Sequence, residues 1–242
     1  MSLRVKLIQS IIHLNENLIF YPRLKRYFKS VLKNREPTVV DVGVNKGQTI
    51  DFFLKLSSET RVFGFEPNQQ LFRFLTTKYH SNNRIQLFQN GISSEKGRLV
   101  FHENIMDETS TFEQVNTDSE YLKNKAKILG VKNVEQLIVN RYEVDVWRLS
   151  DFLKEHHLTH VNVLKIDTEG HEFDCLKGLF EGNSECKIDF IQLESHNDDM
   201  YSRKSDEAID ALLRKNHFQL DARIKHGFGG IDELIYKRSD LL

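Results

Sequence analysis

The sequence predicts an α/β domain built around a mostly parallel β-sheet with helices on both faces. Apolar runs rich in β-branched and aromatic residues, such as 38–42 and 61–65, are typical of buried strands. Each run is followed by a stretch with apolar residues at helical spacing, which indicates alternating strands and helices. A chain of 242 residues with 39% hydrophobic residues can bury one such core, so we expect a single domain.

The first strand, 38–42, leads directly into a glycine turn and a helix. Gly43 and Gly47 lie four residues apart, and apolar residues return at Ile50. Glycine allows the backbone to approach a ligand closely, and the first turn of a helix offers unpaired N–H groups. The turn, with Asn45 between the two glycines, is therefore a predicted ligand site.

Acidic residues near this turn indicate which ligand it binds. Glu66 ends the second strand, 19 residues after Gly47, where a carboxylate can accept hydrogen bonds from both hydroxyls of a ribose. Asp41 precedes the turn and would repel a diphosphate, but it suits an α-ammonium group. The turn also departs from the glycine spacing of the dinucleotide fingerprint. S-Adenosylmethionine contains a ribose and an α-ammonium group without a phosphate, so we expect it as the cofactor.

Three motifs together resemble one family. They are Asp41-Val-Gly-x-x-x-Gly, then Phe65-Glu66-Pro67-Asn68, then Leu164-Lys165-Ile166-Asp167-Thr168-Glu169-Gly170-His171-Glu172. In this order and spacing they are similar to the FkbM family of S-adenosylmethionine-dependent methyltransferases. The resemblance extends from the first strand to the C-terminus. It implies a Rossmann-like class I methyltransferase with a seven-stranded sheet, a C-terminal antiparallel hairpin, and O-methylation of a small-molecule hydroxyl, for example on a sugar or glycoside.

The remaining strands follow the glycine turn in order. They are predicted at 84–89, 98–102, 142–146, 160–167 and 188–193, with a closing antiparallel pair at 218–224 and 232–237. We interpret 98–102 as the return strand of a hairpin after the turn at 94–97. Asn90, at the end of the third strand, either meets the adenosine of the cofactor or serves only as a turn residue. Ser150 is the predicted N-cap of a helix.

Two segments lie outside the predicted core of the methyltransferase domain, 37–242. Residues 1–36 read as an N-terminal arm of two amphipathic helices, interrupted at Pro22. The arm could cap the open edge of the sheet, pack against a second subunit in a homodimer, or lie on a membrane surface. Residues 103–140 are polar and long for a connector, which favours a lid or substrate-binding insertion. At its start, Thr109 to Thr111 either border the crevice or form a solvated loop.

Methyl transfer needs an aligned acceptor oxygen and often a base that removes its proton. Asp167, Glu169 and His196 are the candidates, because they follow the fourth and fifth strands, whose ends should meet at the crevice. His171, in the turn after the fourth strand, is a further candidate for the base. A metal site made of Asp167, Glu194 and His196 is an alternative, but carboxylates at strand ends are common without metals, and we predict none.

Composition narrows the partners and the function. A net charge of −1 and a pI near 6.8 provide no basic field for nucleic acid, so we expect a small-molecule hydroxyl acceptor, such as a carbohydrate. Cys175 and Cys186 have no C-x-x-C spacing and suit reduced thiols in a cytoplasmic protein. Polar residues interrupt the first apolar run, so no signal peptide or transmembrane segment is expected. A non-catalytic Rossmann-like binding module and a nicotinamide-dependent oxidoreductase are the alternative functions.

Overall fold

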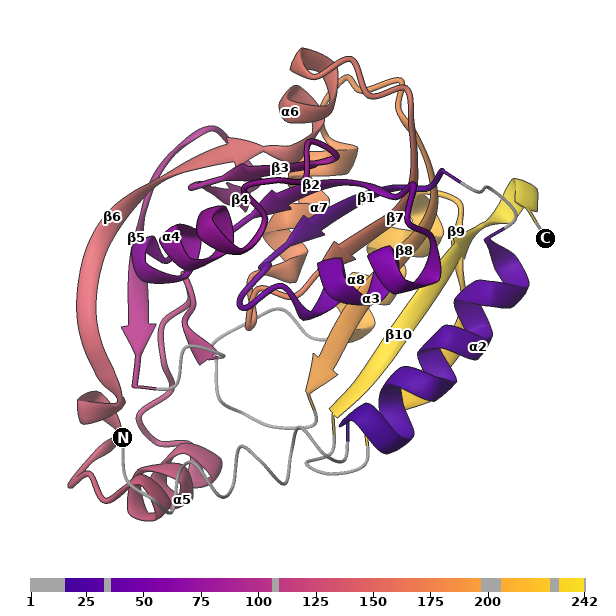
Figure 1. The fold of residues 1–242 in the computed structure, drawn as a ribbon. Helices are drawn as coiled ribbons and strands as arrows, with labels where there is room; N and C mark the ends of the chain where they lie inside the picture. Colours follow the sequence, from indigo (N-terminus) through magenta and orange to yellow (C-terminus); the bar gives the residue numbers. More distant parts are fainter. Residues whose placement is uncertain (1–15, 33–35, 106–108, 197–205, 227–230, 242) are drawn as a thin grey trace.

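The computed structural model describes residues 16–32, 36–105, 109–196, 206–226 and 231–241, and it confirms the predicted α/β fold. A seven-stranded sheet has the order β3-β2-β1-β7-β8-β10-β9 (Figure 1). These strands are β1 (Thr38–Val42), β2 (Arg61–Phe65), β3 (Ile85–Phe88), β7 (His160–Ile166), β8 (Lys187–His196), β9 (Phe218–Lys225) and β10 (Ile231–Arg238). All neighbours pair in parallel except β10, which is antiparallel to β8 and β9, so the predicted closing hairpin is confirmed. The strand order reverses between β1 and β7, where an open α/β sheet forms a crevice at its carboxyl edge.

Helices cover both faces of this sheet because successive strand residues point to opposite sides. Val40 and Val42 of β1 pack with α6, α7 and α8, whereas Val39 packs with α2, α3 and α4. The helices are η1 (Glu16–Phe20), α2 (Tyr21–Val31), α3 (Gln48–Leu56), α4 (Gln69–Lys78), α5 (Glu120–Leu129), η3 (Val134–Leu137), α6 (Leu149–Glu155), α7 (Glu172–Phe180), α8 (Asp206–Lys215) and η4 (Ser239–Leu241). None of the helices described here is long and apolar enough to cross a membrane.

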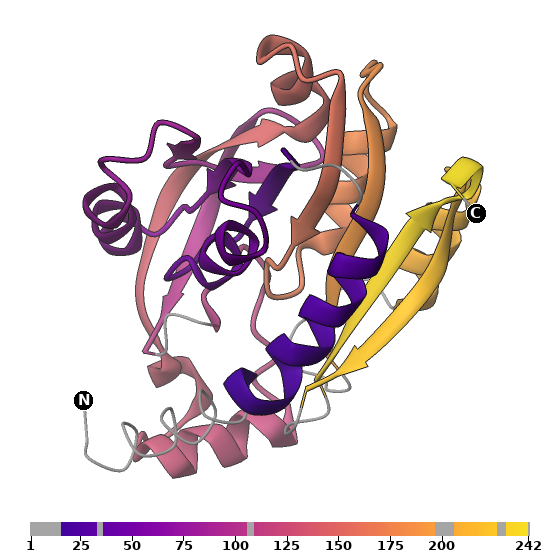
Figure 2. The same cartoon turned by 45° about the vertical axis from the view of Figure 1, so that its right-hand side comes forward.

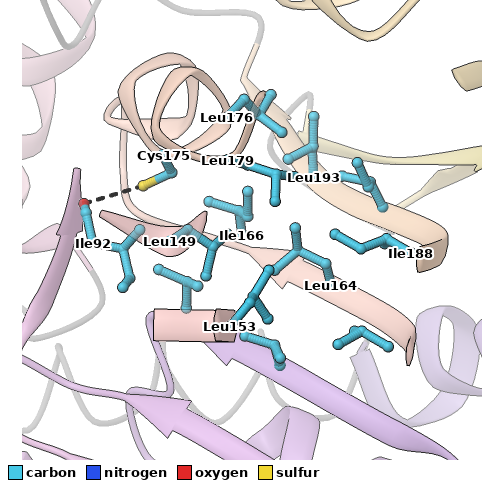
Figure 3. Close-up of a cluster of buried hydrophobic side chains, with 14 of the residues drawn as sticks. Ile92, Leu149, Leu153, Leu164, Ile166, Cys175, Leu176, Leu179, Ile188 and Leu193 are labelled. Atoms are coloured by element: carbon cyan, nitrogen blue, oxygen red, sulfur yellow. Dashed lines mark hydrogen bonds between the residues drawn. The ribbon is translucent and has the colours of Figure 1, made fainter. Parts of the chain in front are cut away.

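The core under α7 joins the large sheet to a smaller one. Figure 3 shows side chains of α7, α6 and β7 packed together, with Cys175 pointing toward Ile92. The Cys175 thiol donates a hydrogen bond to the Ile92 carbonyl oxygen over 3.2 Å. This contact positions the segment after β3 against the start of α7.

The smaller sheet corrects the predicted hairpin at 94–97. Its order is β4-β6-β5, with β4 (Gly91–Ser93), β5 (Gly97–Asn104) and β6 (Ile138–Arg148). Gly91 and Gly97 both pair with Val146, from opposite sides of β6. The return strand therefore does not pair with the strand before the turn, because the 11-residue β6 offers a hydrogen-bonding edge to each.

The described part of the N-terminal arm packs on a face of the sheet, next to the edge strand β9. Leu24 and Phe28 of α2 are buried in the cluster that contains Phe190 of β8 and Ile235 of β10. Figures 1 and 2 both show α2 lying along β9 and β10. Since this apolar face packs within the chain, a homodimer through the arm would need the predicted first helix, which lies mostly in 1–15, outside the described residues.

The helix α6 begins without the predicted cap. Arg148 occupies the N-cap position and makes no side-chain capping hydrogen bond. Ser150 lies inside the helix, 1% exposed, and its hydroxyl has no hydrogen-bond partner among the described residues. The backbone enters the helix straight from β6, so the cap position falls two residues earlier than the serine.

Candidate active site

A cavity of about 510 Å³ lies where the strand order reverses. Six of the nine predicted site residues line it: Gly43, Asn45, Glu66, Asn90, Asp167 and Glu169. Asp41 and Gly47 are not among its lining residues, and the side chain of His196 lies outside the part of the chain that the structure describes. The crevice predicted from the strand ends is therefore present, and most of the predicted side chains reach it.

The Glu66 carboxylate is held by backbone N–H groups on both sides. Its Oε2 accepts from the Asn45 N–H over 2.7 Å, and its Oε1 accepts from the Asn68 N–H over 2.8 Å. Asn68 also caps α4 by accepting from two N–H groups of the first turn. These bonds fix a carboxylate at the wall of the cavity.

The glycine turn allows this approach through backbone conformations that favour glycine. Gly43 has φ +89° and Gly47 has φ +84°. A Cβ on Gly43 would overlap the carbonyl oxygen of Asp167, so the β1 turn and the end of β7 touch through their backbones. Gly47 precedes α3 and accepts a hydrogen bond from the Tyr79 hydroxyl over 3.0 Å, so it shapes the turn from outside the cavity.

Asp41 is completely buried within β1, and neither carboxylate oxygen has a hydrogen-bond partner among the described residues. Burial raises the pKa of Asp41 to about 7; the ammonium group of Lys165 opposes this shift and Asp167 adds to it. Asp41 is therefore divided between its neutral and charged forms near neutral pH. The sequence shows a carboxylate inside an apolar run, but it does not show that the carboxylate oxygens of Asp41 have no hydrogen-bond partner among the described residues.

Because the folded protein holds the Asp41 proton more tightly than the unfolded chain, Asp41 makes stability fall as pH rises from about 4 to about 7. Asn cannot ionise, so the free energy of unfolding of Asp41→Asn should not show this decrease. We expect the decrease between about pH 4 and about pH 7 to be smaller than in the wild type by up to about 4 kcal/mol. Urea unfolding across that pH range measures it, with Asp145→Asn at an exposed position as control. Parallel pH curves for wild type and Asp41→Asn would contradict the assignment.

A buried ion pair faces the cavity from β7. Lys165 Nζ lies 2.6 Å from Asp167 Oδ2, and the lysine is 6% exposed. Burial alone would lower the pKa of Lys165, but Asp167, Glu233 and Asp41 together raise it well above its ordinary value, so the ammonium stays charged. Lys165 is not one of the site residues predicted from the sequence, although a lysine inside the apolar run of the fourth strand is a signal for one.

Lys165 belongs to a polar row that crosses the sheet beneath α2. In the strand register Lys165 lies between Asp41 of β1 and Gln192 of β8. Gln192 Nε2 donates to Glu233 Oε2 of β10 over 3.0 Å. Lys165, Gln192 and Glu233 all line the cavity, although they are distant in sequence.

Glu169 and Glu172, which follow β7, have different roles. Glu172 Oε1 accepts hydrogen bonds from the N–H groups of Thr168 and Gly170, at 3.0 and 3.1 Å. Glu172 is thus the residue that satisfies the N–H groups of the turn. Glu169, with φ +55°, lines the cavity instead.

The segment 109–113 forms another wall of the cavity. Thr109, Ser110 and Thr111 line it, and the Thr111 hydroxyl donates to the Glu169 carbonyl oxygen over 2.8 Å. His171 Nδ1 donates to Glu113 Oε1 over 2.6 Å, and its Nε2 lies 3.0 Å from the Ser93 hydroxyl. Since both ring nitrogens are engaged away from the cavity lining, His171 anchors this wall and is not a candidate base.

One group of carboxylates at the cavity has the spacing of cation ligands. Oxygens of Asp167, Glu169 and Glu194 lie within 4.8 Å of one another. Glu194 was a candidate metal ligand in the sequence, whereas Glu169 was not. The third candidate ligand, His196, has a side chain outside the described residues.

The sequence is similar to proteins that are named methyltransferases. The family model of the methyltransferase FkbM domain matches residues 41–220. The chain is 26% identical to the 2-O-methyltransferase NoeI of Sinorhizobium fredii over 86% of this chain and 83% of that protein. It is 31% identical to Methyltransferase 1 of Beauveria bassiana over 58% of this chain and 57% of that protein. A solved SAM-dependent methyltransferase from Aquifex aeolicus superposes with a TM-score of 0.46 at 12% identity, over 94% of this chain and 96% of that one.

Proposed function

The chain belongs to the methyltransferase FkbM family, and we propose that it methylates a hydroxyl group of a small molecule with S-adenosylmethionine as the donor. A hydroxyl acceptor, such as a sugar or glycoside, is supported by the similar protein that is named a 2-O-methyltransferase. One observation carries the proposal. Glu66, held by two backbone N–H groups, and Asp167, held by a buried lysine, face the same cavity.

The residues around Glu66 fit the adenosine part of this cofactor. The Glu66 carboxylate lines the cavity, and carboxylate oxygens are acceptors of the kind that the two ribose hydroxyls need. Asn90 lines the cavity beside them, and its amide donates to the Asp145 carbonyl oxygen over 3.2 Å, leaving its side-chain oxygen to accept from adenine or ribose. Gly43 and Asn45 bring backbone close to the ligand. We propose that buried Asp41 acts through its effect on Lys165, and that Gly47 acts by shaping the turn.

Residues at the end of β7 then remove the acceptor proton during methyl transfer. S-Adenosylmethionine, when bound, supplies an electrophilic methyl group on a sulfonium. Asp167 accepts the proton of the acceptor hydroxyl, and Lys165 is a positioning residue that holds the Asp167 carboxylate. Glu169 is the second candidate for the base because it lines the same wall, and His196 is the third.

Cofactor binding tests the proposal directly. Isothermal titration of the wild type is expected to detect S-adenosylhomocysteine and not NADH. Glu66→Gln should weaken S-adenosylhomocysteine binding by about 1–3 kcal/mol. The substitution replaces one carboxylate oxygen by an NH2 group, so that a donor would face a ribose hydroxyl that also donates. Glu143→Gln, an exposed position in a surface ion pair, is the control and should bind like the wild type. Equal affinity in wild type and Glu66→Gln would contradict the site.

Membership of the family makes this chain a methyltransferase, which leaves no support for a nicotinamide-dependent oxidoreductase. Failure to bind S-adenosylhomocysteine would favour the remaining alternative, a non-catalytic binding module.

We also propose that 103–140 acts as a lid, because Thr109, Tyr121 and Lys125 from this segment line the cavity. The free thiols Cys175 and Cys186 support a reducing compartment such as the cytoplasm.

A further inference from the structure

The cavity extends well beyond the carboxylate that is proposed to bind the ribose. Glu66 follows β2, Asp167 follows β7 and Glu233 lies in β10, and all three line the cavity. In the sheet order β7 is two strands from β2, and β10 is two strands further on. Neighbouring strands are about 4.8 Å apart, so β10 lies about 19 Å from β2 across the sheet. Since methyl transfer is proposed to take place at Asp167, the part of the cavity between Asp167 and β10 can hold the acceptor.

The N-terminal arm forms a wall of this part of the cavity. Phe20, Tyr21 and Leu24 of η1 and α2 line the cavity, together with Glu16 at the start of η1. The rings of Phe20 and His226 are stacked with their centroids 3.9 Å apart, and the His226 N–H donates to a carbonyl oxygen at the start of β10. This contact places the wall at the β10 end of the cavity, in agreement with the position of α2 along β9 and β10 (Figure 2).

The charges that act on Tyr21 show that the wall also lies near the proposed reacting group. Burial is the main cause that raises the pKa of the Tyr21 hydroxyl, followed by the charge of Glu16. The Lys165 ammonium opposes this shift, whereas Glu233 and Asp167 add to it. These last charges lie on β10 and at the end of β7. Tyr21 is therefore close to the carboxylate at which the acceptor hydroxyl is proposed to react.

The Glu233 carboxylate, which lies beside this wall, has partners within the protein. Gln192 Nε2 donates to Glu233 Oε2 over 3.0 Å, and His226 Nε2 lies 3.7 Å from Glu233 Oε1. Glu233 outweighs the effect of burial and raises the pKa of His226, so that the histidine tends to carry the opposite charge. What the arm mainly adds to this part of the cavity is thus apolar surface, from Phe20 and Tyr21.

The wall lies outside the residues that the chain shares with the family model. That model matches 41–220, which includes Gly43, Glu66 and Asp167 but neither the described part of the arm nor β10. Every S-adenosylmethionine-dependent methyltransferase must bind the same cofactor, whereas each must fit its own acceptor. A wall built outside the matched residues is therefore suited to selecting the acceptor.

We propose that the acceptor carries an apolar group beside the hydroxyl that is methylated, and that Phe20, Tyr21 and Leu24 of the arm bind this group. The inference rests on the proposed function, because it assumes that the cofactor occupies the Glu66 side and that the hydroxyl reacts at Asp167. Burial of the apolar group against the wall favours binding and removes water from around the reacting hydroxyl. The acceptor is then an amphipathic molecule, such as an aryl or alkyl glycoside, and not a sugar phosphate.

Three glucosides that differ only in the aglycone test the proposal. Methyl, hexyl and phenyl β-D-glucopyranoside are titrated at millimolar concentrations into wild-type protein saturated with S-adenosylhomocysteine. The hexyl or the phenyl glucoside, or both, should bind at least about ten-fold more tightly than the methyl glucoside. Ten-fold is about 1.4 kcal/mol, which is less than the complete burial of an aromatic side chain provides. Tighter binding of phenyl than of hexyl would assign the wall to a ring, and the reverse would assign it to an alkyl chain.

Two tyrosines of α2 provide a matched pair of variants. Tyr21→Ala should reduce the preference to about three-fold or less, because it removes a ring of the wall. Tyr27→Ala is the control, because Tyr27 packs in the same cluster on the same helix without lining the cavity, and it should keep the preference. If Tyr21→Ala no longer binds S-adenosylhomocysteine, Tyr21→Gln replaces it, since glutamine suits a helix and presents a polar amide in place of the ring.

Four results would overturn the inference: equal binding of the three glucosides, tightest binding of the methyl glucoside, no binding of any of them, or an unchanged preference in the Tyr21 variant. An equal loss of preference in the Tyr21 and Tyr27 variants would also contradict it, because the effect would then come from the stability of α2. Absence of S-adenosylhomocysteine binding by the wild type is a separate outcome, which contradicts the proposed function before any glucoside is added.

Discussion

Gly43→Ala is expected to destabilise the fold by about 2–5 kcal/mol and to abolish cofactor binding. Gly43 has φ +89°, a conformation that costs an L-residue about 1–2 kcal/mol. An added Cβ would also overlap the Asp167 carbonyl oxygen, which belongs to backbone and cannot rotate away. Relief requires β1 and the end of β7 to separate, at about 1–3 kcal/mol for overpacking. Urea unfolding and titration with S-adenosylhomocysteine measure the two effects.

Gly130→Ala is the matched control for this variant. Gly130 has φ +79° at the end of α5, but a Cβ there meets no atom within 4 Å. It should lose only the conformational part, about 1–2 kcal/mol, and keep its cofactor affinity. If both alanine variants cost the same, the contact with Asp167 contributes nothing and the close approach of the two strand ends is not important for the site.

Asp167→Asn is expected to lower kcat by about 10²–10⁴-fold, the usual contribution of a general base. Asparagine keeps the size of the side chain and an oxygen for the Lys165 ammonium, so the fold and cofactor affinity should change little. The rate of methyl transfer to an acceptor found by screening sugars and glycosides, measured against pH, provides the test. S-Adenosylhomocysteine affinity is measured in parallel.

Asp151→Asn, in the first turn of α6 and away from the cavity lining, is the control and should retain the wild-type rate. A kcat for Asp167→Asn within about ten-fold of the wild type would show that Asp167 is not the base. Glu169→Gln would then be the next variant, because Glu169 lines the same wall.

Much of the fold could be predicted from the sequence because the information is local. The strand, glycine turn and helix at 38–56 are contiguous, and the interaction that orients Glu66 spans only Asn45 to Asn68. The hairpin at β9 and β10 was visible for the same reason. Each of these features depends on residues that are close in the chain and on periodicities of two or 3.6.

Pairing choices between distant segments were harder to predict. The apolar run of β5 indicates a strand, but it does not show that β6 is a better partner than the strand before the turn. In the same way, the apolar face of α2 indicates that the helix is buried. It does not show whether the edge of the sheet, a face of the sheet or a second subunit covers it. In the structure Phe28 meets the face that contains Phe190.

By itself, the sequence determined the fold class, the family and most of the cavity side chains, because strand ends and glycine turns are encoded by neighbouring residues. Only the tertiary structure decided the electrostatics of the site. The sheet register sets Asp41, Lys165 and Gln192 of three strands side by side, and a hydrogen bond joins Gln192 to Glu233 of a fourth strand. Burial then raises the pKa of Asp41, whereas Asp167, Glu233 and Asp41 overcome the effect of burial on Lys165 and keep its ammonium charged.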